Sequence, residues 1–173
     1  LLAARLRGAK PVDTPAPRRV NPDRVPLSPE QERLWLHDQL HPGSAAYTIC
    51  DAVRIDGPLD AEALGAAAAE VSARHESLRT TFHADGGVPY ARVHDRLVPR
   101  VTRHDGEPPV EEIQRRPFDL AAGPLLRLDI ARVGPDRHVL VLSLHHIVGD
   151  GWSMSLLVRE LTAVYLRKGL PAL

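Results

Sequence analysis

The stretch from His138 to His146 constrains the fold of this chain more than any other segment. It reads HVLVLSLHH, with aliphatic side chains on both faces of an extended strand. A strand that is apolar on both faces has to be covered on both sides, so we expect it to lie centrally in a sheet. The next residues, Gly149 to Gly151, predict a turn out of the sheet. Apolar residues then recur at helical spacing from a start near Ser153.

The remaining pattern predicts a mixed α/β (α+β) fold with a largely antiparallel mixed sheet and packing helices. Ser28 can cap a first helix that ends near His41, with Pro29 at the first helical position and Gln31 completing a capping box. Asp60 can cap a second helix that runs to about Glu76. A short helix is expected at 109–116, and strands are expected at 47–55, 78–83, 88–94, 98–103 and 125–133.

Composition excludes several classes of function. The 173 residues suit one domain or one lobe of a larger unit, and 22 basic side chains balance 22 acidic ones. Such a balance argues against nucleic acid or an anionic membrane as the main partner. Cys50 is the single cysteine, so an internal disulfide is impossible and a reducing, cytoplasmic location is expected. No apolar run is long enough to span a membrane.

The first 24 residues differ from the rest. Five prolines and several arginines between Pro11 and Pro26 give the composition of an extended linker. We therefore expect residues 1–24 to be a linker, or the end of an upstream carrier or docking segment. The folded unit is expected to cover residues 25–173.

Candidate chemistry lies where the apolar strand gives way to the next helix. Successive side chains of a strand point to opposite faces, so His145 and His146 should be separated. That geometry disfavours a zinc site made of these two residues and Asp150, and no metal is expected. A single histidine at a strand end can handle a proton near neutral pH. No Ser-His or Cys-His pair is evident, which favours direct transfer between two bound substrates over a covalent enzyme intermediate.

The turn itself offers two further groups. Gly151 stands at a helix start, where backbone N–H groups can favour a developing oxyanion. Asp150 can cap the helix or pair with a buried arginine, and Ser153 can also act as a cap. The competing interpretation is that both histidines belong to the core and that the two polar residues only cap the helix.

Three separated segments resemble the motifs of condensation domains of nonribosomal peptide synthetases, in the order of that family. They are LSPEQERLW at 27–35, RHESLRTTF at 74–82 and HHIVGDGWS at 145–153. The tract from Pro117 to Arg127 is similar to the family as well. Together these segments span nearly all of the expected folded part.

The resemblance implies a fold like that of chloramphenicol acetyltransferase, in which two lobes form a V around a tunnel. This chain would be the amino-terminal lobe. Upstream and downstream peptidyl carrier proteins would deliver thioesters on 4'-phosphopantetheine arms, and the acceptor amine would attack the donor to form an amide. No cofactor would be bound directly by the lobe, and adjacent synthetase domains would be further partners.

The resemblance also implies roles for residues. His146 would be the central histidine, as general base or as a group that positions the amine, while His145 would be mainly structural. Asp150 would form a shaping salt bridge, and Gly151 would offer backbone contact near the thioester. The supporting residues would be Trp152, Ser153 and Arg79.

The chain departs from the family pattern by stopping at Leu173, before the second lobe. We therefore expect this polypeptide alone not to catalyse condensation and to expose an apolar face where the carboxy-terminal lobe would sit. Three alternatives stay open: an epimerisation domain, a coenzyme A-dependent acyltransferase of the same fold, and a scaffold that binds carriers without catalysis.

Overall fold

The computed structural model describes residues 21–170, and the expected linker therefore lies almost entirely outside the described residues. The elements in chain order are α2 (Pro29–Leu40), β1 (Thr48–Asp56), α3 (Ala61–Arg74), the 3₁₀ helix η1 (Glu76–Arg79), β2 (Thr80–Asp85), β3 (Val88–Val93), β4 (Arg100–Asp105), α4 (Val110–Arg115), β5 (Leu126–Gly134), β6 (Arg137–His145) and α5 (Gly151–Tyr165).

The main sheet has the strand order β1-β6-β5-β4. β6 pairs antiparallel with both β1 and β5, which confirms that the most apolar strand is central. β4 runs parallel to β5, so the sheet is mixed and largely antiparallel as expected. A separate two-stranded sheet, β2-β3, is an antiparallel hairpin.

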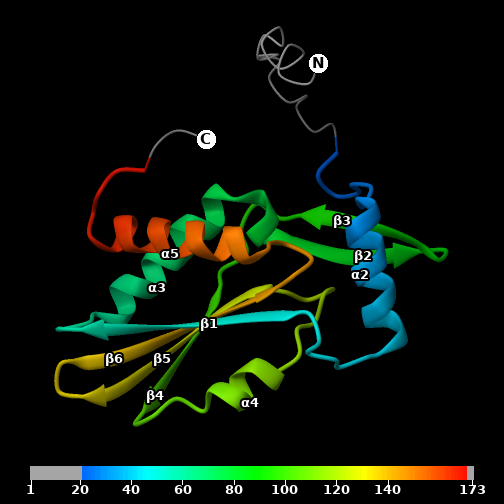
Figure 1. The fold of residues 1–173 in the computed structure, drawn as a ribbon. Helices are drawn as coiled ribbons and strands as arrows, with labels where there is room; N and C mark the ends of the chain where they lie inside the picture. The colour runs from blue at the N-terminus through cyan, green and yellow to red at the C-terminus, as the bar shows by residue number, and fades with distance from the viewer. Residues whose placement is uncertain (1–20, 171–173) are drawn as a thin grey trace, which may run out of the picture.

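The larger hydrophobic core lies between the main sheet and two helices. α3 and α5 cover one face of the sheet, and α4 lies on the opposite side (Figure 1). Successive side chains of β5 and β6 point to opposite faces of the sheet, so every second one points towards these helices. Among these side chains, Leu126, Leu128 and Leu142 are fully buried. Each such leucine contributes about 1.5–3 kcal/mol relative to an exposed one.

A second core joins α2 to the β2-β3 hairpin, beside which the helix stands (Figure 1). Phe82 of the hairpin, Leu34 of α2 and Leu125, the residue just before β5, belong to this cluster. Ile147, two residues beyond β6, belongs to the same cluster. The segment that follows the central strand is thus built into the second core.

Local signals explain most element boundaries, with two corrections. The Ser28 and Gln31 capping box is present, and Asp60 caps α3. Leu78, expected in a strand, lies in η1 instead, where the hydroxyl of Thr80 donates to the carbonyl of Glu76 (2.7 Å). The last helix begins at Gly151, before the expected start near Ser153.

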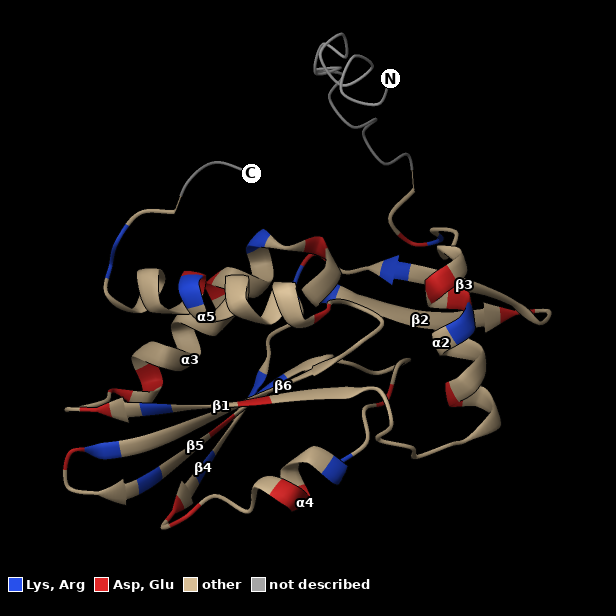
Figure 2. Cartoon of the chain, in the orientation of Figure 1, with Lys and Arg blue, Asp and Glu red and all other residues tan. Residues whose placement is uncertain are grey.

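Acidic and basic residues are interspersed along the elements and do not gather on opposite sides of the chain (Figure 2). Of the helices in residues 21–170, none is both long and apolar enough to cross a membrane. Within the same residues, no three histidine, cysteine or acidic side chains gather as metal ligands would.

Candidate active site

His145 is the last residue of β6 and is a buried structural group, 5% exposed. Its amide donates to the carbonyl of Leu125 (3.0 Å), and its Nδ1 accepts from the amide of Ile147 (3.1 Å). Its ring meets Phe118 edge-on at 6.0 Å between centroids. Burial, aided by the neighbouring His146, lowers the pKa of His145 to about 4, so the ring is neutral at physiological pH.

His146 is the first residue beyond β6, and its side chain is exposed. Its backbone is nevertheless fixed, because its amide donates to the carbonyl of Tyr47 at 2.9 Å, just before β1. The two neighbouring imidazoles therefore lie in opposite environments, as strand alternation predicts. The arrangement presents one histidine to solvent from a backbone that is held in place.

The next two residues, Ile147 and Val148, hold the backbone of His146 in this position. Ile147 is 3% exposed in the second core, and its carbonyl accepts from the side chain of Gln31 on α2 (3.3 Å). Val148 packs against both hydrophobic cores, and its amide donates to the carbonyl of His145 (3.1 Å). Sequence reasoning missed Gln31 and Tyr47 as anchors of the site, since their contacts with this segment are visible only in three dimensions.

Gly149 is required by close packing. A Cβ at this position would stand 2.7 Å from Cδ2 of Leu144 and 3.0 Å from Cβ of Ser153. A Cβ at Gly151 would meet no heavy atom within 4 Å. The space beside Gly151 is therefore open, and a ligand can approach its backbone there.

Asp150 is the N-cap of α5. Its Oδ1 accepts from both the amide and the hydroxyl of Ser153, each at 2.8 Å. These hydrogen bonds stabilise the carboxylate and lower the pKa of Asp150. No lysine or arginine among the described residues forms an ion pair with Asp150, so the salt bridge that the resemblance implies for it stays a prediction.

The supporting roles that the resemblance implies for Arg79 and Trp152 stay predictions, and the structure shows what each side chain contacts. The guanidinium of Arg79 donates to the carbonyl of His94 (2.6 Å) and lies 3.6 Å from the carboxylate of Glu76. It therefore stabilises the junction of η1 with the hairpin. Trp152 follows Gly151 on α5 and is 74% exposed.

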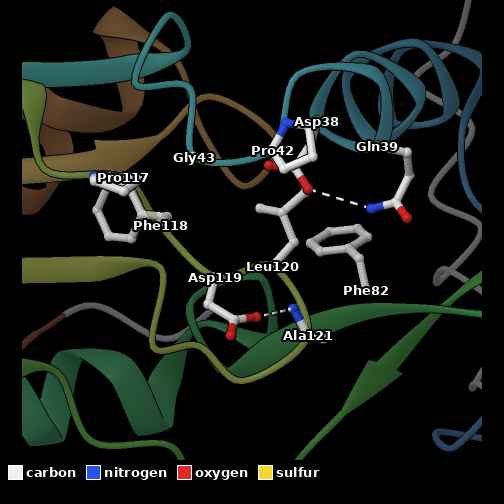
Figure 3. Close-up of a pocket in the computed structure, with 10 residues that line it drawn as sticks. All are labelled: Asp38, Gln39, Pro42, Gly43, Phe82, Pro117, Phe118, Asp119, Leu120 and Ala121. Atoms are coloured by element: carbon white, nitrogen blue, oxygen red, sulfur yellow. Dashed lines mark hydrogen bonds between the residues drawn. The ribbon is translucent and has the colours of Figure 1, made fainter.

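A cavity of about 360 Å³ lies between the end of α2 and the segment from Pro117 to Ala121 (Figure 3). Phe118 lines this cavity and also contacts His145. His146 is not part of the wall, so this cavity is not the space into which the imidazole opens. The exposed histidine faces the molecular surface.

Comparison with known proteins identifies this architecture. The family model of the condensation domain matches residues 21–172. The chain is 43% identical over 179 residues to phosphinothricin tripeptide synthetase PhsC of Streptomyces viridochromogenes, covering 95% of this chain and 16% of the relative. It is 40% identical to the dimodular nonribosomal peptide synthase of Bacillus subtilis, covering 95% of this chain and 7% of the relative.

Solved structures agree with the sequence comparisons. The X-domain in its complex with OxyB from teicoplanin biosynthesis superimposes with a TM-score of 0.77 at 34% identity, over 85% of this chain and 33% of that chain. The starter condensation domain of rhizomide synthetase RzmA gives a TM-score of 0.75 at 23% identity, over 86% of this chain and 39% of that chain, and supports the fold alone. The chain thus spans little more than a third of the structures it resembles.

Proposed function

This chain belongs to the condensation-domain family of nonribosomal peptide synthetases, and from that membership we propose that it supplies the histidine-bearing lobe of an amide-forming site. The donor is an acyl or peptidyl thioester on an upstream carrier protein. The acceptor is an aminoacyl thioester on a downstream carrier, and 4'-phosphopantetheine arms hold both. The amine nitrogen forms a bond to the donor carbonyl carbon, the carbon–sulfur bond breaks, and the proton leaves with the thiol of the donor arm.

The observation that carries the proposal is the contrast between the two histidines. His145 is buried and holds the turn, whereas His146 is exposed on a backbone fixed by Tyr47. An exposed imidazole can accept a hydrogen bond or a proton from an attacking amine, which has an ordinary pKa near 8. A Cβ at Gly151 would meet no heavy atom within 4 Å, so the donor carbonyl oxygen can approach the backbone at the start of α5.

The test replaces His146 in the full synthetase with both carriers loaded. We expect His146→Ala to reduce amide formation by about 10²–10⁴-fold, the range typical of a lost proton-transfer group. His41→Ala is the matched control, because His41 is also exposed and lies at the end of α2. Unchanged product formation by His146→Ala would refute the proposal.

His146→Gln distinguishes the two roles of the imidazole. A glutamine can orient an amine by hydrogen bonding but cannot accept its proton at neutral pH. If the imidazole is a base, this variant loses as much activity as His146→Ala. If the imidazole positions the amine, the variant retains most of the rate.

A second function, partner binding without catalysis, is favoured by one observation. A solved structure that resembles this chain at 34% identity is an X-domain bound to another protein, OxyB. A carrier-binding scaffold of this kind would bind loaded carriers equally well before and after replacement of His146, and neither form would give product.

A further inference from the structure

Arg127, at the start of β5, is an internal cation on the sheet face opposite α3 and α5. It is 6% exposed, and its guanidinium carbon lies 3.7 Å from the centroid of the Phe118 ring. Its two terminal nitrogens donate to main-chain carbonyls, at 3.0 Å to Pro117 and at 2.6 Å to Arg116. Its Nε is buried and has no hydrogen-bond partner.

The charge of Arg127 has no direct counter-ion within residues 21–170, where no carboxylate oxygen lies within 4.0 Å of its nitrogens. The nearest candidate on the same strand is Asp129, and that carboxylate is already held by His104 (2.8 Å) and Arg116 (3.5 Å). Burying a guanidinium without an anion is unfavourable, because carbonyl dipoles replace only part of its hydration. Burial, together with the charge of Arg116, lowers the pKa of Arg127 to about 10.

A cavity of about 140 Å³ opens onto this cation. A second arginine, Arg100 at the start of β4, lines the same cavity, and no ion pair of Arg100 occurs in the described part of the chain. The other walls are Pro117, Phe118, Asp119, Gly123 and Pro124. The volume equals that of roughly four to five water molecules in the liquid, which is enough for one phosphate or carboxylate group.

The one acidic group in the wall does not neutralise the two arginines. Oδ1 of Asp119 accepts from the amides of Ala121 and Ala122, both at 2.9 Å, and so holds its own turn. Neither oxygen of Asp119 lies within ion-pair distance of Arg100 or Arg127 in this part of the structure. Two guanidinium groups against one carboxylate leave the cavity with an excess of positive charge.

We propose that the cavity between Arg100 and Arg127 binds a small oxyanion, a phosphate or carboxylate group, which compensates the buried charge of Arg127. Planar guanidinium groups suit such ligands, since they donate two parallel hydrogen bonds to a pair of oxygens. The site is distinct from the exposed His146 and does not depend on the proposed function.

The test measures the thermal midpoint of the intact chain in sodium phosphate, sodium acetate and sodium chloride at matched ionic strength. We expect phosphate or acetate, but not chloride, to raise the midpoint in a saturable way, as a ligand of the native state does. A stronger effect of phosphate assigns the site to a phosphate group, and an equal effect of acetate assigns it to a carboxylate.

Arg100→Gln is the decisive variant, because this side chain is exposed and we expect the fold to tolerate its replacement. We expect it to weaken anion binding about tenfold, as measured by calorimetric titration with inorganic phosphate. Arg96→Gln is the matched control: Arg96 is exposed on the connection between β3 and β4 and does not line the cavity. Absence of saturable stabilisation, or an equal response of Arg100→Gln and the native chain, overturns the proposal.

A crystal structure in phosphate gives an independent outcome. Density for an anion beside Arg127 supports the proposal. Density for water that bridges Nε of Arg127 to Oδ2 of Asp129, both of which lack a partner, overturns it.

Discussion

Replacement of Gly149 by alanine tests whether close packing fixes the turn that presents His146. The new Cβ would lie 2.7 Å from Cδ2 of Leu144 and 3.0 Å from Cβ of Ser153, both closer than carbon atoms pack. Leu144 is fully buried and so has little room to turn away. Forcing an extra methyl group into a well-packed interior costs about 1–3 kcal/mol, and we expect Gly149→Ala to destabilise the chain by this amount.

Gly151→Ala is the matched control two residues away. The Cβ there would meet nothing within 4 Å, and the position is the first residue of α5. Alanine at a compatible position lowers the conformational entropy of the unfolded chain. We therefore expect this variant to raise the free energy of unfolding by about 0.4–1 kcal/mol. The two substitutions are chemically identical, and their effects on stability should have opposite signs.

Urea unfolding followed by circular dichroism measures the difference, with the free energy of unfolding obtained by linear extrapolation. For a domain of this size, each kcal/mol also shifts the thermal midpoint by about 2–4 °C. Unfolding free energies for the two variants that agree within about 0.5 kcal/mol would show that the turn relaxes freely around Gly149. In that case packing does not hold the backbone of His146 in place.

Three further predictions concern buried or capping charges. The folded-state pKa of His145 lies below the usual 6.5, so the unfolded chain takes up a proton first, and up to about 3 kcal/mol of stability should be lost as pH falls from 6.5 to 4. Urea unfolding across this range should show a pH slope that His145→Asn reduces, while the lowered pKa of His94 leaves part of the slope in place. Glu160 is buried against His75 and Arg74, so Glu160→Gln should lower the free energy of unfolding in urea by about 1.5–3 kcal/mol. The control, Glu111→Gln, removes an exposed ion pair and should lower it by less than about 0.5 kcal/mol. Asp150→Asn should keep the thermal midpoint close to that of the native chain because asparagine also caps helices, and Asp150→Ala should lower it.

The elements with strong local signals were predictable. The capping box at Ser28 and Gln31 satisfies backbone groups within one turn, so it does not depend on the rest of the fold. The central position of β6 follows from its two apolar faces. The start of α5 was placed too late because both Asp150 and Ser153 are good caps, and only the geometry shows that the aspartate accepts while the serine donates.

Features that depend on contacts across the fold were not predictable in the same way. The parallel pairing of β4 with β5 has no local signature, although the intervening helix and loop are long enough for such a crossover. The burial of Arg127 has no local sequence signature either, because an arginine in a strand is normally solvated. Because side chains alternate along a strand, the sequence predicted that His145 and His146 lie on opposite faces. It could not reveal that the ring of Phe118 contacts the ring of His145.

The position of His146 depends on both cores at once. His145 ends a strand of the main sheet, whereas Ile147 is buried with α2 and the hairpin, and Val148 touches both clusters. The histidine between them can keep its place only while the two cores keep their relative arrangement. A substitution in α2 that never contacts His146, such as one that removes the hydrogen bond from Gln31 to the carbonyl of Ile147, should therefore alter the presentation of the imidazole before it unfolds the sheet.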